Sequence, residues 1–156
     1  MNKIISKEQF SEKVFKLEIE APLIAKSRRA GHFVIVRVDE KGERMPLTIA
    51  GSDLNKGTIT LVVQTVGLSS TKLCNLNEGD YVLDVVGPLG QATHIQNYGT
   101  VVCAGGGVGV APMLPIIQAL KTAGNRVISV LAGRSKDLII LENEVRASSD
   151  EVMIMT

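Results

Sequence analysis

The stretch that decides the fold is Gly105-Gly106-Gly107-Val108-Gly109-Val110-Ala111-Pro112. It follows an apolar run at residues 100–104 and precedes residues 113–120, where apolar residues recur at the spacing of a helix. A strand, a glycine turn and a helix in that order form a phosphate site, because glycine admits an anion close to the backbone and the helix N-terminus supplies free N–H groups. The pattern is not the Rossmann fingerprint, whose third glycine would fall on Val110. A plain strand-to-helix turn is the alternative interpretation.

The region after residue 97 alternates strands and helices. Strands are predicted at residues 100–104, 126–131 and 151–155, with helices at about 110–123 and 138–147. This βαβαβ order predicts a parallel sheet, about half of a doubly wound nucleotide domain. We therefore expect residues 97–156 to be the first part of an incomplete NAD(P)-binding α/β domain and the chain to be a fragment, with a natural mini-domain as the alternative.

The region before residue 97 reads as short strands. Runs rich in β-branched residues occur at 14–19, 33–38, 58–63 and 81–86, and glycine or proline turns separate them. Only residues 69–76 look helical. Several strands at short spacing predict a small antiparallel barrel, here residues 1–96.

Composition excludes several classes of protein. The net charge of +1 gives no field for nucleic acid or a membrane surface, and aromatic residues make up only 3% of the chain. No apolar run reaches transmembrane length, and the first ten residues lack the apolar core of a signal peptide. Cys74 and Cys103 form no metal or disulfide pattern, which suits a reducing cytoplasm. His32 and His94 have no partner in the sequence, so no catalytic residue is assigned.

A second constellation lies in the predicted barrel. Residues 44–48 combine an arginine, a proline and a hydroxyl, and residues 66–73 place a glycine before three hydroxyl residues at a helix start. Ser69 and Ser70 can cap that helix, or they can share its free N–H groups with a phosphate. The pattern alone leaves both interpretations open and favours capping.

Four motifs in order identify a resemblance. Arg-x-Pro-Leu-Thr at 44–48, Val-Gly-x-Ser-Ser at 66–70, Gly-Pro-Leu-Gly at 87–90 and the glycine run with Ala-Pro resemble the ferredoxin–NADP reductase superfamily. Within it the chain is most similar to the small flavin subunit of NADH-dependent ferredoxin:NADP oxidoreductase, also called sulfide dehydrogenase subunit beta. The electron-transfer subunit of dihydroorotate dehydrogenase B is a close relative. The resemblance implies a Greek-key barrel that binds FAD, followed by the nucleotide domain.

The resemblance also implies which residues bind cofactors. In the barrel, one segment would lie against the flavin ring, a strand beside the ribityl chain, and an arginine and a turn at the pyrophosphate. The glycine run would hold the nicotinamide nucleotide. The flavin ring would contact Met45, Pro46, Leu47 and Thr48, and the ribityl chain would lie beside Val63, Gln64 and Thr65. The pyrophosphate would meet Arg44, Gly67, Ser69 and Ser70. The nicotinamide nucleotide would meet Gly105, Gly106, Gly107 and Gly109. Gln64 replaces a basic residue that is common in relatives.

The implied chemistry is hydride transfer from NAD(P)H to FAD, followed by single-electron transfer to a larger oxidoreductase subunit, with ferredoxin a further possible partner. Relatives carry a [2Fe–2S] cluster on a cysteine-rich tail; such a cluster needs four thiolates, and this chain has two cysteines. The expected metal ligands are therefore absent here, and we expect weak or no activity from this chain alone. The alternatives are the electron-transfer subunit of a dihydroorotate dehydrogenase, a flavin-binding fragment without activity, and a regulatory module that binds nucleotide without redox chemistry.

Overall fold

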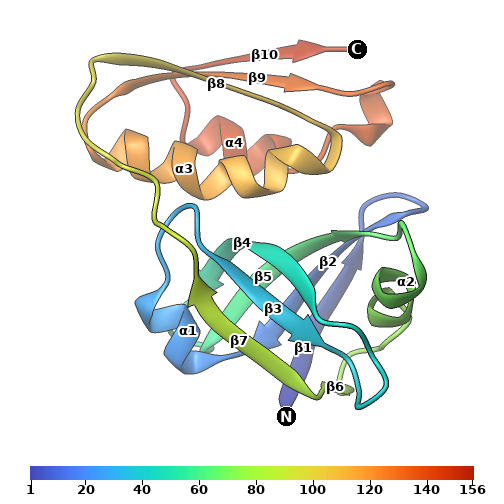
Figure 1. Ribbon diagram of the computed structural model, residues 1–156. Coiled ribbons are helices and arrows are strands. Elements are labelled where there is room, and N and C mark those ends of the chain that lie inside the picture. Colours follow the sequence, from blue (N-terminus) through green and yellow to red (C-terminus); the bar gives the residue numbers. More distant parts are fainter.

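The computed structural model describes residues 1–156 and contains two sheets (Figure 1). Seven strands form one sheet in the order β6-β1-β2-β5-β4-β3-β7, and three form the other in the order β10-β9-β8. The first sheet is antiparallel and curls into a nearly closed barrel, and the second is parallel with helices. The fold class expected from the sequence is confirmed.

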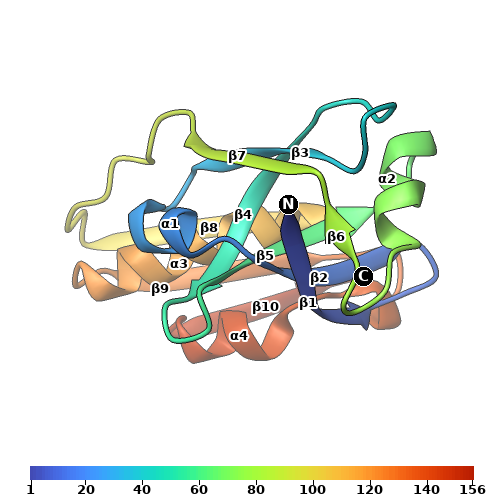
Figure 2. The same cartoon turned by 90° about the horizontal axis from the view of Figure 1, so that it is seen from below.

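The barrel closes around one apolar core. Its strands are β1 (Asn2–Gln9), β2 (Val14–Glu20), β3 (Phe33–Arg37), β4 (Met45–Asp53), β5 (Thr58–Gln64), β6 (Tyr81–Val82) and β7 (Asp84–Leu89), with short helices α1 (Pro22–Ser27) and α2 (Leu68–Cys74). Alternate residues of each strand point inward, so Leu17, Ile19, Ile59 and Leu61 are fully buried. Figure 2 views this barrel from below.

Several barrel elements differ from the expectation. The expected strand at 81–86 is divided into β6 and β7, and β1, β4 and α1 were not expected. Strand β1 is mostly polar and fully buries only Ile4, so it lacks the apolar alternation that marks a strand. Helix α1 has six residues and starts with Pro22 in its first turn, which is too short to show helical periodicity. The expectation of a single helical turn before residue 97 was therefore wrong.

The α/β unit packs its two helices on one face of its sheet. Its elements are β8 (Thr100–Gly106), the 3₁₀ turn η1 (Gly107–Gly109), α3 (Val110–Thr122), β9 (Arg126–Ala132), the 3₁₀ turn η2 (Lys136–Leu138), α4 (Glu142–Ala147) and β10 (Glu151–Met155). The expected helix over 138–147 is wrong in its first half. Leu141 has a left-handed φ of 58°, which no helix continues through, so α4 begins after it.

The helices of the α/β unit lie between its sheet and the barrel (Figure 1). Ala50 of β4 belongs to the same buried cluster as Val110 and Ile117 of α3. The connecting segment, residues 90–99, is fixed by the buried Asn125, whose side chain donates to Gln96 O and Leu120 O at 2.9 Å each. The expected domain boundary at 96/97 lies within this segment. None of the helices combines the length and the apolar character needed to cross a membrane.

Two adjoining cavities form the candidate binding site

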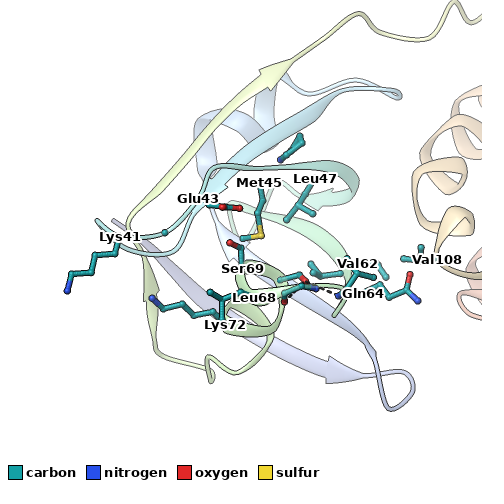
Figure 3. Close-up of a pocket in the computed structure, with 16 residues that line it drawn as sticks. Lys41, Glu43, Met45, Leu47, Val62, Gln64, Leu68, Ser69, Lys72 and Val108 are labelled. Carbon is teal, nitrogen blue, oxygen red and sulfur yellow. Dashed lines mark hydrogen bonds between the residues drawn. The ribbon is translucent and has the colours of Figure 1, made fainter.

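The first cavity lies on the barrel, between β4, β5 and α2 (Figure 3). Its volume is about 600 Å³. Met45 and Leu47 of β4 and Val62 of β5 supply apolar walls, and Lys41 lies on the loop before β4. The cavity is lined by Lys41, Gly42, Glu43, Met45, Pro46, Leu47, Val62, Val63, Gln64, Val66, Gly67, Leu68, Ser69, Ser70, Lys72 and Val108.

Two large apolar side chains are exposed at this cavity. Val66 is 79% exposed and Leu68 is 86% exposed, on either side of Gly67. Water-facing side chains of this size beside a hollow are typical of a surface that an apolar or aromatic ligand covers. The sequence analysis missed both residues, although an apolar pair flanking a turn glycine is a signal that could have found them.

The turn at residues 66–70 uses its two serines differently. The Ser70 hydroxyl is buried and accepts hydrogen bonds from the backbone N–H groups of Val66, at 2.9 Å, and Gly67, at 3.1 Å. It also donates to Gly67 O at 3.2 Å. Ser69 lines the cavity, and its hydroxyl makes no hydrogen bond within the chain. Ser70 therefore caps the turn, and Ser69 is the serine available to a ligand.

The charges at this cavity are partly neutralised. Lys72 forms an ion pair with Asp39, and its hydrogen bond holds the pKa of that carboxyl below its usual range. Lys41 and Arg44 have no ion-pair partner in the structure. They are the basic side chains near the cavity whose charge is left for an anionic ligand, although Arg44 itself does not line it.

The second cavity lies at the carboxyl ends of β8 and β9, where ligands bind in open parallel sheets. Its volume is about 800 Å³. The β1–β2 turn of the barrel forms one wall, and the glycine turn and the segment after β9 form the other. Its lining residues are Ser11, Glu12, Lys13, Val14, Gln64, Gly106, Gly107, Val108, Ala132, Gly133, Arg134, Leu138 and Ile140.

The glycines of the turn are not all required by the fold. Gly107 has a φ of +54°, a left-handed conformation that favours glycine. A Cβ on Gly109 would meet nothing within 4 Å, and one on Gly106 would meet its nearest atom at 3.6 Å, an ordinary contact. The protein itself therefore has room for a methyl group at both positions, so packing within the chain does not require glycine there.

Gln64 and Val108 line both cavities. Gln64 ends β5 of the barrel, and Val108 lies in the glycine turn of the α/β unit. Figure 3 places these two side chains on the side of the first cavity that faces the α/β unit. The two cavities therefore meet at the boundary between the units.

The structure brings most of the expected site residues together. Eight of them line the first cavity, namely Met45, Pro46, Leu47, Val63, Gln64, Gly67, Ser69 and Ser70, and Gly106 and Gly107 line the second with Gln64. Arg44, Thr48, Thr65, Gly105 and Gly109 line neither cavity. No group of His, Cys, Asp and Glu side chains is placed to hold a metal ion, and both cysteines are free.

Residues 2–94 match the family model of the oxidoreductase FAD-binding domain, and the chain belongs to this family. It is 44% identical over 154 residues to a homologue of the dihydroorotate dehydrogenase B (NAD(+)) electron transfer subunit from Thermotoga maritima, covering 99% of this chain and 55% of that protein. The corresponding subunit of Streptococcus pneumoniae is 30% identical over 99% of this chain and 61% of its own length. The chain thus spans little more than half the length of these relatives.

Solved structures show the same arrangement. The structure of an NADH-dependent reduced ferredoxin-NADP oxidoreductase, described for flavin-based electron bifurcation, has a TM-score of 0.95 and 43% identity, covering 99% of this chain and 56% of that one. Phthalate dioxygenase reductase has a TM-score of 0.78 at 20% identity, over 99% of this chain and 50% of that one, and shares the fold. The superfamily resemblance drawn from the sequence is confirmed.

The first cavity fits the chemistry of FAD. An isoalloxazine ring needs apolar walls, which Met45, Leu47 and Leu68 provide. A pyrophosphate needs donors and positive charge, for which the cavity offers the Ser69 hydroxyl and Lys41. A Cβ on Gly67 would meet no atom within 4 Å, so the backbone of the turn is accessible to a ligand.

Proposed function

We propose that the chain is the flavin-binding and nucleotide-accepting part of an electron-transfer flavoprotein subunit that oxidises NAD(P)H. The observation that carries the proposal is the shared wall of the two cavities at Gln64 and Val108. A dinucleotide in the second cavity and a flavin in the first would approach each other there. Hydride transfer requires such proximity between donor and acceptor.

The residues have distinct roles in this proposal. Met45, Pro46, Leu47 and Thr48 lie along the flavin ring, and Val63, Gln64 and Thr65 along the ribityl chain. Arg44, Gly67, Ser69 and Ser70 serve the pyrophosphate, Ser70 by shaping the turn. Gly105, Gly106, Gly107 and Gly109 form the turn for the nicotinamide nucleotide. Bound FAD would supply the chemistry that links a hydride to single electrons. The apolar walls of the first cavity would orient it and exclude water.

The destination of the electrons is a larger partner subunit in this proposal. The similarity to an electron transfer subunit homologue of dihydroorotate dehydrogenase B and to a ferredoxin-NADP oxidoreductase structure supports a heteromeric complex. The partner would receive electrons through a [2Fe–2S] cluster held outside residues 1–156, with ferredoxin as a further acceptor. The second candidate function, electron transfer for dihydroorotate oxidation, is favoured by the relatives from Thermotoga maritima and Streptococcus pneumoniae.

Two measurements test the proposal. Protein saturated with FAD and then desalted should keep its flavin absorbance, and Leu68→Glu should lose it, because a charge would replace an exposed apolar wall of the cavity. Leu54→Glu is the matched control, since Leu54 is 70% exposed and lines neither cavity. Excess NADH or NADPH, added anaerobically, should then bleach the bound flavin over a long incubation, although we expect steady-state turnover by this chain alone to be weak. A folded but colourless protein would contradict the proposal, and a flavin that neither nucleotide bleaches would reduce it to a flavin-binding fragment.

A further inference from the structure

Two basic side chains without partners line the second cavity from different units. Lys13 lies in the β1–β2 turn of the barrel, and Arg134 follows β9 of the α/β unit. Neither forms an ion pair in the structure. Glu12 is the only acidic residue that lines this cavity. The cavity therefore has an excess of positive charge that the protein leaves unpaired.

The backbone that carries Lys13 is fixed. Its carbonyl accepts hydrogen bonds from Thr65 N, at 2.8 Å, and Thr65 Oγ1, at 3.4 Å. The next residue, Val14, is in register with Gln64 in the β2–β5 pair. Lys13 is thus attached beside the residue at which the two cavities meet.

The backbone that carries Arg134 is also tightly placed. A Cβ on the preceding Gly133 would lie 2.9 Å from Ile139 Cδ1 and 3.2 Å from Ser135 O, so this position is tightly packed. Gly133 N also donates to Met155 O at 3.0 Å, which ties this segment to the end of β10. The two cations therefore project from two constrained backbones on the walls of one cavity.

We propose that Lys13 and Arg134 form a clamp, across the two units, on the phosphates of a pyridine dinucleotide. The inference rests on the proposed function for the identity of the ligand and adds a barrel residue to its binding. The backbone of Gly106 and Gly107 contributes to the same cavity, so the phosphates would contact both units at once. Arginine offers a planar fork of donors to a phosphate, and lysine offers a flexible point charge.

Calorimetric titration of the FAD-loaded full chain with NAD⁺, NADP⁺ and adenosine tests the clamp, because the oxidised dinucleotides carry the same phosphates and cannot reduce the flavin during the measurement. Lys13→Ala and Arg134→Ala should each weaken binding of both dinucleotides roughly tenfold, the size expected for one lost charge-assisted contact. Lys13→Arg should retain most of the affinity. Adenosine, which has no phosphate, should bind each variant as it binds the wild type. Lys26→Ala is the control, because Lys26 is exposed, has no ion-pair partner and lines neither cavity.

The flavin signal separates this inference from the proposed function. Retained FAD absorbance with weakened dinucleotide binding supports the clamp. Unchanged dinucleotide affinity in Lys13→Ala overturns it while leaving the proposed function intact. An equal loss of affinity for adenosine and the dinucleotides would show a structural role for Lys13 and also overturn it. A wild-type chain that holds FAD but binds neither dinucleotide overturns the clamp together with the NAD(P)H half of the proposed function.

Discussion

The barrel and the α/β unit cover their sheets to different extents. The barrel curls its seven strands around sixteen buried apolar residues, with its own strands closing the core. The three-stranded sheet of the α/β unit packs α3 and α4 on the face toward the barrel, and no element of the chain covers the other face (Figure 1). Val102, Met153 and Met155 are 65%, 51% and 60% exposed on that face.

This difference shows where each unit obtains its stability. The barrel supplies its own core, whereas the core of the α/β unit also takes Ala50, Phe10 and Val62 from the barrel. An apolar residue of the parallel sheet therefore contributes to stability when it lies on the face toward the helices, and contributes little when it lies on the uncovered face. The barrel is a support for the α/β unit as well as a site for the flavin.

The largest effect expected from this comparison is a contrast between the two faces of the parallel sheet. Leu131 of β9 is fully buried toward the helices, so Leu131→Ala should lower the free energy of unfolding by about 2–5 kcal/mol. Val102→Thr on the uncovered face should change it by less than about 0.5 kcal/mol. Native-state hydrogen exchange of the β8 and β9 amides measures both changes. Equal effects would show that the outer face is covered in solution.

The sequence predicted the barrel and the parallel sheet where side-chain periodicity is strong. Strands β2, β3, β5, β8 and β9 are rich in β-branched residues and were found close to their observed positions. Strands β1 and β4 were not predicted, because β1 is polar and β4 contains Pro46 and Gly51, which weaken a strand pattern. These two strands are positioned by pairing with strands that are distant in the sequence, and a short stretch of sequence carries no information about such pairing.

Only part of the candidate site was likewise predicted from the sequence. The motifs located the residues of the two turns, because glycines and hydroxyls at a helix start have a local chemical meaning. The meeting of Gln64 with Val108, and the place of Lys13 in the second cavity, depend on how α3 packs on β4. The choice between Ser69 and Ser70 as the cap depends on side-chain direction, which the spacing of two adjacent serines does not determine.

A second test of the difference between the barrel and the α/β unit uses the two cysteines. Burial in the barrel core raises the pKa of the Cys74 thiol to about 11, and half-burial in the α/β unit raises the pKa of Cys103 as well. The folded state thus holds the Cys74 proton more tightly than the unfolded state does. Its contribution to stability is complete below the unfolded pKa, near 8.5–9, and is lost as the pH rises toward about 11.

Urea unfolding at several alkaline pH values measures this loss. Cys74→Ala should lower stability at pH 7 but make it less dependent on pH between about 9 and 11 than in the wild type. Because lysines and tyrosines titrate in the same range, the difference between the two proteins is the informative quantity. Cys103→Ala should leave the alkaline dependence closer to that of the wild type, since Cys103 is less buried. Identical slopes for wild type and Cys74→Ala would contradict a buried thiol in the barrel core.

The smallest expected effect distinguishes the two ligand turns. The barrel turn is held by the Ser70 hydroxyl, so Ser70→Ala should cost about 1 kcal/mol of stability in the absence of FAD. Ser69→Ala should cost almost nothing, because the Ser69 hydroxyl makes no hydrogen bond within the chain. In the α/β turn, Gly106 has an extended φ of −129° and a Cβ there would meet no atom closer than 3.6 Å, so Gly106→Ala should also leave stability within about 0.5 kcal/mol of the wild type.

Ligand titrations of the same three variants complete this last prediction. Ser69→Ala should weaken FAD binding with no change in thermal stability of the FAD-free protein, since only the bound cofactor uses that hydroxyl. Gly106→Ala should leave FAD binding intact and weaken NADH binding, because its methyl group would enter the second cavity, which Gly106 lines. If Ser69→Ala destabilises the FAD-free protein as much as Ser70→Ala does, the assignment of capping to Ser70 and ligand contact to Ser69 is wrong. If Gly106→Ala binds NADH as the wild type does, the nucleotide does not approach the backbone of this turn.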